Sequence, residues 1–176
     1  MARVRLLEGG ETAQTQELAD RISKGRRGNL LGIYKALLHN PKLAETWFAH
    51  LNAVRWETGL GGRLREIMII RIGWLLRSAY ILKQHVPKLA APEGLDEAHC
   101  RALQSDAVEE HFPPAEIAAI RLADEVTIEA RASGEAMAEV KKHYDDKMIV
   151  EMMVLIGTYN MHARFVSGLD IELEKD

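Results

Sequence analysis

The chain is poor in the residues that build redox and metal centres. Cys100 is the only cysteine among 176 residues, so neither an intrachain disulfide nor a CxxC pair can form. A lone thiol is compatible with a reducing cytosol. The seven histidines show no HExxH-type spacing, which argues against a metal site. The glycine-rich stretch 59–62 lacks a preceding strand and a GK[ST] sequence, so we expect no phosphate-binding loop there.

Long apolar runs and a strong charge bias are also absent. The N-terminal sequence has no apolar segment that would serve as a signal peptide, and Met152–Gly157 is far too short to cross a bilayer. The net charge is only −3, and no basic run is long enough to indicate nucleic-acid binding. We therefore expect a cytoplasmic protein that has neither a membrane nor a nucleic acid as its partner.

What is present is an ordinary globular composition with helical periodicity. Apolar residues make up 47% of the chain and charged residues 28%. No segment alternates with period two between hairpin turns, so we predict an all-α fold of about seven or eight helices. There is no repeat of fixed period and no long linker. We expect an N-terminal arm and surface helix over 1–24, one domain over 25–170 and a C-terminal tail over 171–176.

Several helix starts can be predicted from capping residues. Asn40 precedes Pro41, Asp96 precedes a short helix, and Asp145 precedes the long helix over 146–167. Ser78 is similarly placed to cap a helix that begins at 79. The long last helix is apolar nearly all round, which predicts burial inside the domain or against another subunit.

The stretch 66–85 gathers the residues best suited to chemistry. Glu66, Ser78, Tyr80 and His85 lie within twenty positions, and an apolar run separates the acid from the others. In one unbroken helix, Glu66 and His85 would be about 28 Å apart and could not share a site. If the chain turns back between Leu75 and Ser78, the same residues can meet in one pocket.

This stretch resembles the carboxymuconolactone decarboxylase family, whose members share the AhpD-like all-helical fold with the alkylhydroperoxidases. The resemblance extends over about residues 25–170. It implies a homo-oligomer, commonly a trimer or a hexamer. The matching segments are Arg63–Met68, Tyr80 with His85-Val86-Pro87 and Ala90, Gly94-Leu95, Gly28-Asn29-Leu30, Asn40-Pro41, Tyr159-Asn160-Met161 and Ala163-Arg164-Phe165.

The chain departs from the peroxidase branch of that family at both cysteines. In that branch a glutamate precedes a CxxC pair and a histidine follows it; Glu66 and His85 occupy these two positions here. Ser78 and Ile81 occupy the cysteine positions. Reduction of peroxide by a dithiol needs one thiolate to attack and a second thiol to resolve. Thiol peroxidase activity is therefore not expected, although the fold alone would suggest it.

The remaining acid, imidazole and phenol suit proton transfer. Glu66 in apolar surroundings could have a raised pKa, and histidine is the side chain most readily poised near neutral pH, so we expect Glu66 and His85 to act as acid and base. Tyr80 would donate a hydrogen bond to a developing oxyanion. Further substrate-binding candidates are Ser78, Arg71, Tyr159 and Arg164. The expected reaction is a cofactor-free decarboxylation, or a related lyase reaction, of a small organic acid or lactone, as in aromatic-compound degradation.

Each of these residues also has a structural interpretation that the sequence leaves open. Glu66 could pair with Arg63 or Arg65 near a helix start, Ser78 could be only a helix cap, and the arginines could form ion pairs. His85 could be a buried histidine without a reaction to serve. The whole chain could then be a non-catalytic ligand-binding or structural oligomer. Residual peroxidase activity through Cys100 is the weakest alternative, because the chain has no resolving thiol.

Overall fold

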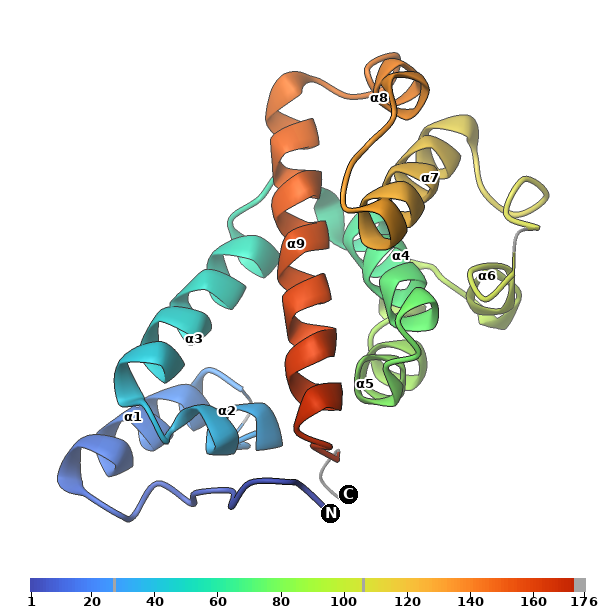
Figure 1. The fold of residues 1–176 in the computed structure, drawn as a ribbon. Helices are drawn as coiled ribbons and strands as arrows, with labels where there is room; N and C mark the ends of the chain where they lie inside the picture. The colour runs from blue at the N-terminus through green and yellow to red at the C-terminus, as the bar shows by residue number, and fades with distance from the viewer. Residues whose placement is uncertain (27, 106, 173–176) are drawn as a thin grey trace. The chain divides into compact units, whose positions relative to one another are not determined.

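The fold consists of helices throughout the described part of the chain. The computed structural model describes residues 1–26, 28–105 and 107–172, and in these ranges it contains nine α-helices, one 3₁₀-helix and no strand. The all-α prediction is confirmed, with one helix more than expected (Figure 1). Of the predicted C-terminal tail, residues 173–176 lie outside the described ranges.

In chain order the helices are α1 (Ala13–Lys24), α2 (Gly32–Leu37), α3 (Pro41–Trp56), α4 (Gly61–Leu75), α5 (Ala79–Lys88), η1 (Ala91–Glu93), α6 (Glu97–Ala102), α7 (Pro114–Glu129), α8 (Gly134–Val140) and α9 (Asp146–Gly168). Their contacts cluster in two compact units. The first contains Met1–Trp56 and the chain from Phe165 onward, and the second contains Glu57–Arg164.

The first unit packs α1 and α2 against α3. Helix α1 begins with a capping box, in which the side chains of Thr12 and Thr15 each bind the other residue's backbone N–H. Near the C-terminus, the ring of Phe165 lies 5.3 Å from that of Trp47. The two chain ends meet in this unit, because the N–H of Arg3 donates to the carbonyl of Leu169 at 2.8 Å.

The second unit is built around α4. Ten consecutive residues of this helix, Leu64–Gly73, are buried, including Arg65, Glu66 and Arg71. Helices α5 and α7 pack against α4, and α8 packs against α7. A core of apolar side chains from α4, α6, α7 and the intervening loops fills the space between them. Three ionisable groups are thus enclosed in the middle of the unit and need partners there.

The chain turns back sharply between α4 and α5, which is the second of the two geometries considered for the stretch 66–85. The N–H of Arg77 donates to the carbonyl of Trp74 at 3.1 Å, and the N–H of Ser78 donates to the carbonyl of Gly73 at 2.9 Å. This pair of bonds is a Schellman motif, in which Arg77 takes the left-handed position with φ of 50°. The turn makes α4 and α5 antiparallel neighbours.

Gly73 sets the spacing of these two helices. A Cβ atom at this position would lie 3.0 Å from Cγ2 of Ile81 and 3.0 Å from Cδ2 of Leu82. Both contacts are with α5 and are closer than ordinary van der Waals contact, so a side chain at residue 73 would force the Ile81 and Leu82 side chains to shift. The close approach is what lets residues of α4 reach polar side chains on α5.

The capping predictions have different outcomes. The side chains of Asn40, Asp96 and Asp145 accept backbone hydrogen bonds from Leu43, His99 and Met148 respectively, so these three caps are confirmed. Ser78 occupies the N-cap position of α5, yet its side chain makes no capping bond. The expectation that its hydroxyl caps the helix is wrong, because the hydroxyl is buried and accepts no hydrogen bond from the first N–H groups of α5.

Helix α9 is not enclosed on all sides within the described chain. Ile149, Met152 and Leu155 are buried, but Val150, Val154 and Met161 are 62%, 42% and 43% exposed. The sequence predicted burial inside the domain or against another subunit, and burial within the chain is incomplete. No helix in the described part of the chain has the length and hydrophobicity needed to cross a membrane.

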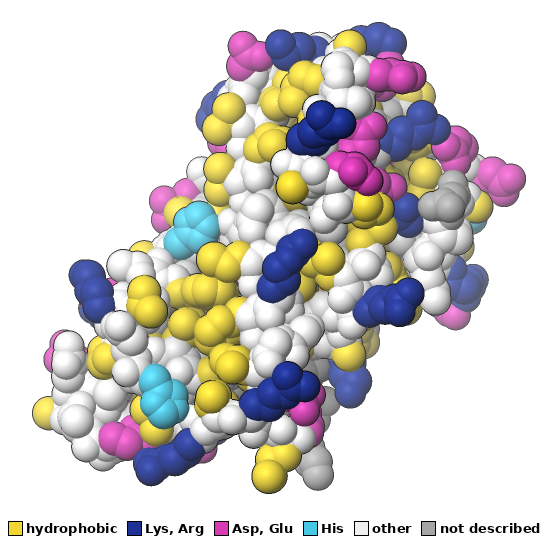
Figure 2. All heavy atoms as spheres, viewed as in Figure 1, with side chains coloured by type: hydrophobic (Ala, Val, Ile, Leu, Met, Phe, Trp, Pro, Cys, Tyr) yellow, Lys and Arg dark blue, Asp and Glu magenta, His cyan; other side chains and the backbone are white. Residues whose placement is uncertain are grey.

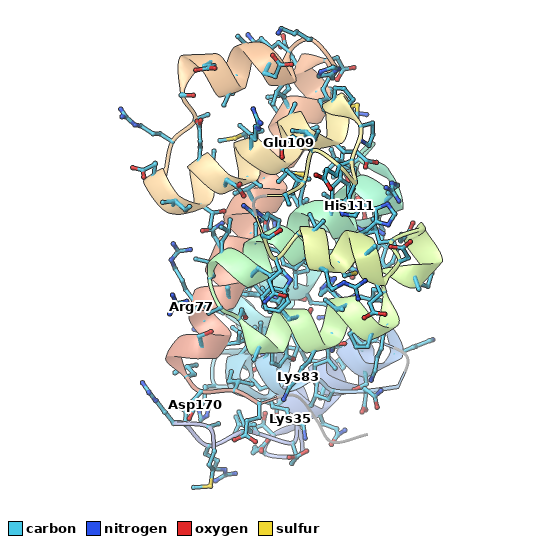
Figure 3. All side chains as sticks on the ribbon, turned by 90° about the vertical axis from the view of Figure 1, so that its right-hand side faces the viewer. Lys35, Arg77, Lys83, Glu109, His111 and Asp170 are labelled. Atoms are coloured by element: carbon cyan, nitrogen blue, oxygen red, sulfur yellow. The ribbon has the colours of Figure 1, made fainter. Side chains whose placement is uncertain are left out.

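The left-handed Arg77 gives a direct test of the α4–α5 turn. Arg77 is exposed and lies at the turn (Figure 3), so its replacement by glycine removes strain without disturbing a packed side chain. We expect Arg77→Gly to raise the free energy of unfolding by about 0.5–1 kcal/mol, since glycine adopts positive φ without a steric cost.

The measurement is urea unfolding followed by circular dichroism. Arg77→Ala is the matched control, because it removes the charge and keeps the Cβ atom; its effect should stay within about 0.5 kcal/mol. Equal stabilisation by alanine and glycine would show that the charge, and not the backbone conformation, is responsible.

Candidate functional site

The antiparallel arrangement of α4 and α5 brings Glu66 and His85 together. Nδ1 of His85 lies 2.5 Å from Oε2 of Glu66, in a short hydrogen bond. The two side chains are buried, with exposed fractions of 1% for Glu66 and 6% for His85. The acid and the imidazole, which would be about 28 Å apart in one continuous helix, therefore form a contact pair.

The surroundings of the Glu66 carboxyl are mixed and not simply apolar. Ile67, Ile69 and Ile70 are fully buried beside it in the sequence. The other carboxyl oxygen, Oε1, lies 3.7 Å from Nε of Arg65, and the guanidinium of Arg65 reaches Glu93 at 3.5 Å. The sequence left Arg63 and Arg65 open as ion-pair partners of Glu66, and Arg65 is the one in contact with it. Its positive charge offsets the negative charge of a buried carboxylate.

Aromatic rings of α9 lie against this pair. The ring of Tyr159 meets the His85 ring edge to face, with centroids 5.7 Å apart. The ring of His162 stacks on Tyr159 at 5.8 Å with only 9° between the planes, and also approaches Tyr80 at 5.8 Å. These contacts form a continuous column of rings that runs His85, Tyr159, His162, Tyr80.

His162 is the member that the sequence did not single out. It lies three residues after Tyr159, so the two side chains share one face of α9. This face packs against α5, where Tyr80 and His85 contribute the other two rings. The i, i+3 pairing of a tyrosine and a histidine on an apolar helix was the available signal. What the sequence lacked was any indication of which helix that face would meet.

Ser78 is a predicted site residue with an unsatisfied polar atom. Its side chain has no exposed surface, and its hydroxyl has no hydrogen-bond partner within the described ranges. A buried hydroxyl without a partner costs free energy. Ser78 is the N-cap residue of α5 and His85 follows it by seven residues, which places them on the same side of the helix about two turns apart.

Arg71 lies in a different environment. Its guanidinium forms a bidentate ion pair with Asp124 of α7, with N–O distances of 2.6 and 2.8 Å. The remaining nitrogen donates to the carbonyls of Leu103 and Ser105 at 3.0 and 2.6 Å. Arg71 thus joins α4, α7 and the end of α6, and it is not brought to the Glu66–His85 pair.

Arg164 also lies apart from the pair. It is exposed on α9 and donates to both the carbonyl and the side-chain oxygen of Asn160, at 3.1 and 2.6 Å. Asn160 in turn donates to the hydroxyl of Thr127 on α7 at 2.9 Å. The structure therefore gathers Glu66, His85, Tyr80 and Tyr159 and leaves Arg71 and Arg164 outside.

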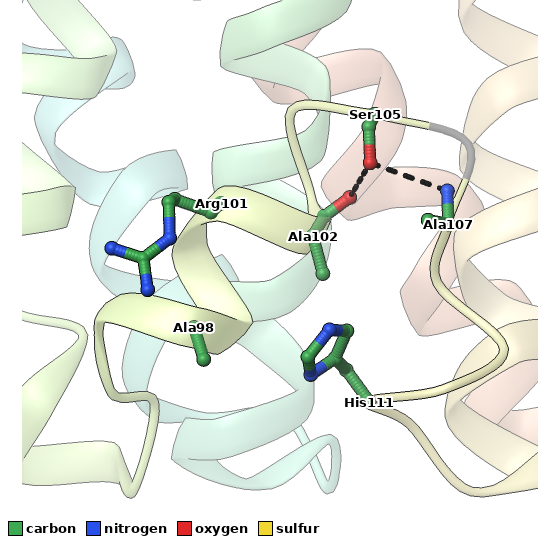
Figure 4. Close-up of a pocket in the computed structure, with 6 residues that line it drawn as sticks. All are labelled: Ala98, Arg101, Ala102, Ser105, Ala107 and His111. Atoms are coloured by element: carbon green, nitrogen blue, oxygen red, sulfur yellow. Dashed lines mark hydrogen bonds between the residues drawn. The ribbon is translucent and has the colours of Figure 1, made fainter.

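A surface pocket of about 290 Å³ lies at α6 and the loop that follows it (Figure 4). Ser105 braces this loop, donating to the carbonyl of Ala102 and accepting from the N–H of Ala107, each at 3.2 Å. None of the predicted site residues lines the pocket. Its lining residues are Ala98, Arg101, Ala102, Ser105, Ala107 and His111.

Cys100, the only thiol, lies in the apolar core on α6 and not beside the pair. Burial raises the pKa of the Cys100 thiol, and the negative charge of Asp96 raises it further. The reactive thiolate is therefore disfavoured at neutral pH. Over residues 1–26, 28–105 and 107–172, no three His, Cys, Asp or Glu side chains are grouped so as to hold a metal ion.

Taken together, the fold and the pair define an all-helical protein with a buried acid–imidazole dyad against an aromatic column. With the Glu66 carboxylate ionised, Nδ1–H of His85 donates to it, and Nε2 is the nitrogen that can take up a proton. A carboxylate that fixes the tautomer of a histidine in this way orients it for acid–base chemistry.

The comparisons with known proteins agree with this class. Residues 41–125, which include both members of the dyad, match the model of the carboxymuconolactone decarboxylase family. The resemblance found in the sequence is confirmed over these residues. Tyr159 and His162 lie beyond the matched segment. No curated protein sequence matches the chain.

Solved structures share the fold over nearly the whole chain. An uncharacterised peroxidase-related protein from Silicibacter sp. TM1040 has a TM-score of 0.83 at 17% identity, covering 98% of this chain and 92% of its own. The alkylhydroperoxidase AhpD core from Ralstonia eutropha JMP134, also an uncharacterised peroxidase-related protein, gives 0.83 at 15%, covering 99% and 93%. The debrominase Bmp8 with 2,3,4-tribromopyrrole gives 0.80 at 16%, covering 99% and 94%. At these identities the similarity establishes the AhpD-like fold alone.

The contacts of Arg71 predict a structural role that stability measurements can test. Arg71→Ala would leave the carboxylate of Asp124 and two carbonyls without their donor, so we expect a loss of about 3 kcal/mol in the free energy of unfolding. Arg71→Lys should also lower the free energy of unfolding, but by less than Arg71→Ala, because an ammonium group keeps the charge and cannot form the bidentate pair.

Urea unfolding of both variants, with the exposed Arg121→Ala as control, provides the measurement. Arg121 pairs with Glu109 at the surface, and its removal should change stability by less than about 1 kcal/mol. A stable Arg71→Ala protein that had lost only ligand binding would instead support the substrate-binding role expected from the sequence.

The burial of Cys100 predicts an unreactive thiol. In the native protein at pH 7–8 we expect iodoacetamide to modify Cys100 at least about tenfold more slowly than it modifies the urea-unfolded chain. The reaction should accelerate only at a pH above the pKa of an ordinary cysteine, because burial raises the pKa of the Cys100 thiol.

Peroxide consumption should be the same for the native protein and Cys100→Ala. A decrease in the variant would support the peroxidase alternative.

Proposed function

We propose that this protein is a cofactor-free enzyme that transfers protons during decarboxylation, or a related lyase reaction, of a small organic acid or lactone. The observation that supports it is the buried hydrogen bond between Nδ1 of His85 and Oε2 of Glu66, at 2.5 Å. A buried acid–imidazole pair costs desolvation free energy, and reactive sites are where such pairs recur.

In the proposed reaction His85 carries the proton. Loss of carbon dioxide from a β-keto acid, or from a lactone with an activating carbonyl, leaves an electron pair on an enolate. The imidazolium form of His85 donates a proton from Nε2 to the enolate carbon, and the neutral imidazole later regains one from water. Glu66 holds the ring in orientation and stabilises the imidazolium through Nδ1.

The neighbouring side chains have supporting roles in this scheme. The phenol of Tyr80 is an O–H donor for the developing enolate oxygen. The Ser78 hydroxyl, buried without a partner in the described part of the chain, is available to a substrate oxygen. Tyr159 and His162 would form the aromatic wall against which an unsaturated acid or lactone packs.

Arg71 and Arg164 have no place in the proposed reaction, because the first is held by Asp124 and the second is bound to Asn160 at the surface. Thiol peroxidase chemistry is not proposed either, since Ser78 and Ile81 stand where the peroxidase branch has cysteines. Because a lone buried thiol suits reducing conditions, we place the reaction in the cytoplasm.

A second function has one observation in its favour. The rings of Tyr159 and His162 pack directly against His85 and Tyr80, which are only 6% exposed each. Side chains that fill the space beside the dyad are typical of a structural core. The chain would then be a non-catalytic ligand-binding or structural oligomer that retains the AhpD-like fold.

Mutation of the dyad tests the proposed function. On whichever compound in a panel of γ-lactones and β-keto acids is turned over, we expect Glu66→Gln and His85→Ala each to lower kcat by about 10²- to 10⁴-fold. Product formation is followed by release of carbon dioxide and by ultraviolet absorbance. His143→Ala is the matched control, because this partly exposed histidine forms an ion pair with Glu139 at 3.6 Å and lies outside the proposed site.

The outcomes separate the two functions. Full activity in both dyad variants, with folding confirmed by circular dichroism, would refute the proton-transfer proposal. If no compound of the panel is turned over but some raise the melting temperature of the protein, the ligand-binding alternative is supported instead.

A further inference from the structure

A chain of charged side chains leads from the dyad to the surface of the second unit. Beyond the contact of His85 with Glu66, Oε1 of Glu66 lies 3.7 Å from Nε of Arg65. Nη2 of the same arginine lies 3.5 Å from Oε1 of Glu93. Arg65 and Glu66 are buried, whereas the side chain of Glu93 is 35% exposed. When His85 is protonated, positive and negative charges alternate along the whole chain, so each charge lies beside one of opposite sign.

Glu93 is placed by η1, which packs against both α4 and α5. The residue after it is also fixed, because Nη1 of Arg63 on α4 donates to the carbonyl of Gly94 at 2.6 Å. Helix α4 begins beside the Glu93 carboxyl group and has no hydrogen bond from a side-chain cap at its own N-cap residue. A carboxylate is favourable there, because the first N–H groups of a helix carry a partial positive charge.

Gly62, the second residue of α4, leaves the space that the Glu93 carboxyl group occupies. A Cβ atom at this position would lie 1.8 Å from Oε2 and 2.3 Å from Oε1 of Glu93. Because alanine is more favourable than glycine within a helix, the glycine needs another explanation. The Glu93 carboxyl group supplies it, since any side chain at residue 62 would force that group to move.

The position of Glu93 determines how the charge of Arg65 acts on the dyad. Arg65 lies between two carboxylates, and the one from Glu93 offsets its positive charge. Glu66 then keeps a net negative charge toward His85, which favours the imidazolium. Without Glu93, the positive charge of Arg65 would act against a proton on His85.

Helix α9 contributes rings to the other side of the dyad. Tyr159 lies against His85, and tyrosine is uncharged at neutral pH. His162 stacks on Tyr159 and also lies against Tyr80, so a proton on His162 would oppose a proton on His85. The outer side of α9, which faces the viewer in Figure 2, carries hydrophobic side chains along its length. The negative charges that act on His85 through these contacts therefore come from α4 and η1.

We propose that Glu93 is a positioning residue of the Glu66–His85 dyad, because it holds Arg65 beside Glu66 and offsets the charge of the arginine. The Glu66 carboxylate is then left to stabilise the imidazolium of His85. Gly62 is the residue that makes room for Glu93. This role rests on the proposed function, in which the imidazolium is the proton donor.

Titration of His85 by nuclear magnetic resonance tests this role without a substrate. The His85 signal is identified by its loss in His85→Ala. In Glu93→Gln we expect the titration midpoint of His85 to fall by about 0.5–1 pH unit, because a negative charge that favours the imidazolium is removed. An unchanged midpoint would overturn the proposal.

Glu139→Gln is the matched control for the change in charge. The side chain of Glu139 is 41% exposed and pairs with Lys142, and its helix α8 packs against α7. The His85 midpoint should move by less than about 0.2 pH unit in this variant, because solvent and salt screen distant charges. Equal shifts in the two variants would show an effect of net charge alone and would overturn the role of Glu93.

Gly62→Ala tests the space that Glu93 occupies. The added methyl group should displace the Glu93 carboxyl group and lower the His85 midpoint as Glu93→Gln does. In a Glu93→Gln background, where no charge is left to displace, Gly62→Ala should cause no further change. Gly134→Ala is the control, because Gly134 also lies in the first turn of its helix and its Cβ atom would have no neighbour within 4 Å. Additive shifts, or none in Gly62→Ala, would overturn the proposal.

The pH dependence of turnover separates this role from a purely structural one. On any compound that is turned over, kcat of Glu93→Gln should be lost with rising pH about 0.5–1 unit earlier than in the unmodified protein, because the imidazolium is lost earlier. A Glu93–Arg65 pair that served stability alone would lower the free energy of unfolding in urea and leave the His85 midpoint and the profile in place, which would overturn the proposal. Full activity of both dyad variants together with a shifted midpoint in Glu93→Gln would refute the proton-transfer function and still support the link from Glu93 to His85.

Discussion

Three ionisable side chains on a fully buried helix impose the main constraint on this structure. Arg65, Glu66 and Arg71 project from α4 into an interior where an unpaired charge is costly. Their partners come from different elements: His85 from α5, Glu93 from η1 and Asp124 from α7. The elements of the second unit are therefore arranged around α4 so that each of these buried charges faces an opposite charge or a polar group.

The dyad shows how far sequence reasoning could go. The family spacing favoured a break between α4 and α5, but whether Glu66 and His85 then meet was left open by the sequence. Caps such as Asn40 and Asp145 were equally predictable, because a capping side chain binds a backbone group three residues away. Interactions that depend on nearby residues, or on a recognised spacing, were accessible from the sequence alone.

Other parts of the site depend on tertiary packing that the sequence does not encode locally. Arg71 and Asp124 are 53 residues apart, and only the docking of α7 on α4 makes their pairing visible. The same holds for His162, whose place beside Tyr80 follows from how α9 meets α5. For Ser78, the sequence indicates the N-cap position of α5, but it does not show that the buried hydroxyl leaves the N–H groups there unbound.

The ring column on α9 has a consequence for access to the dyad. Because Tyr159 stacks with His162 and both lie against α5, a molecule larger than water can approach His85 from this side only when these rings separate. In the proposed enzyme, α9 is then a gate, and the rate at which it moves would limit turnover.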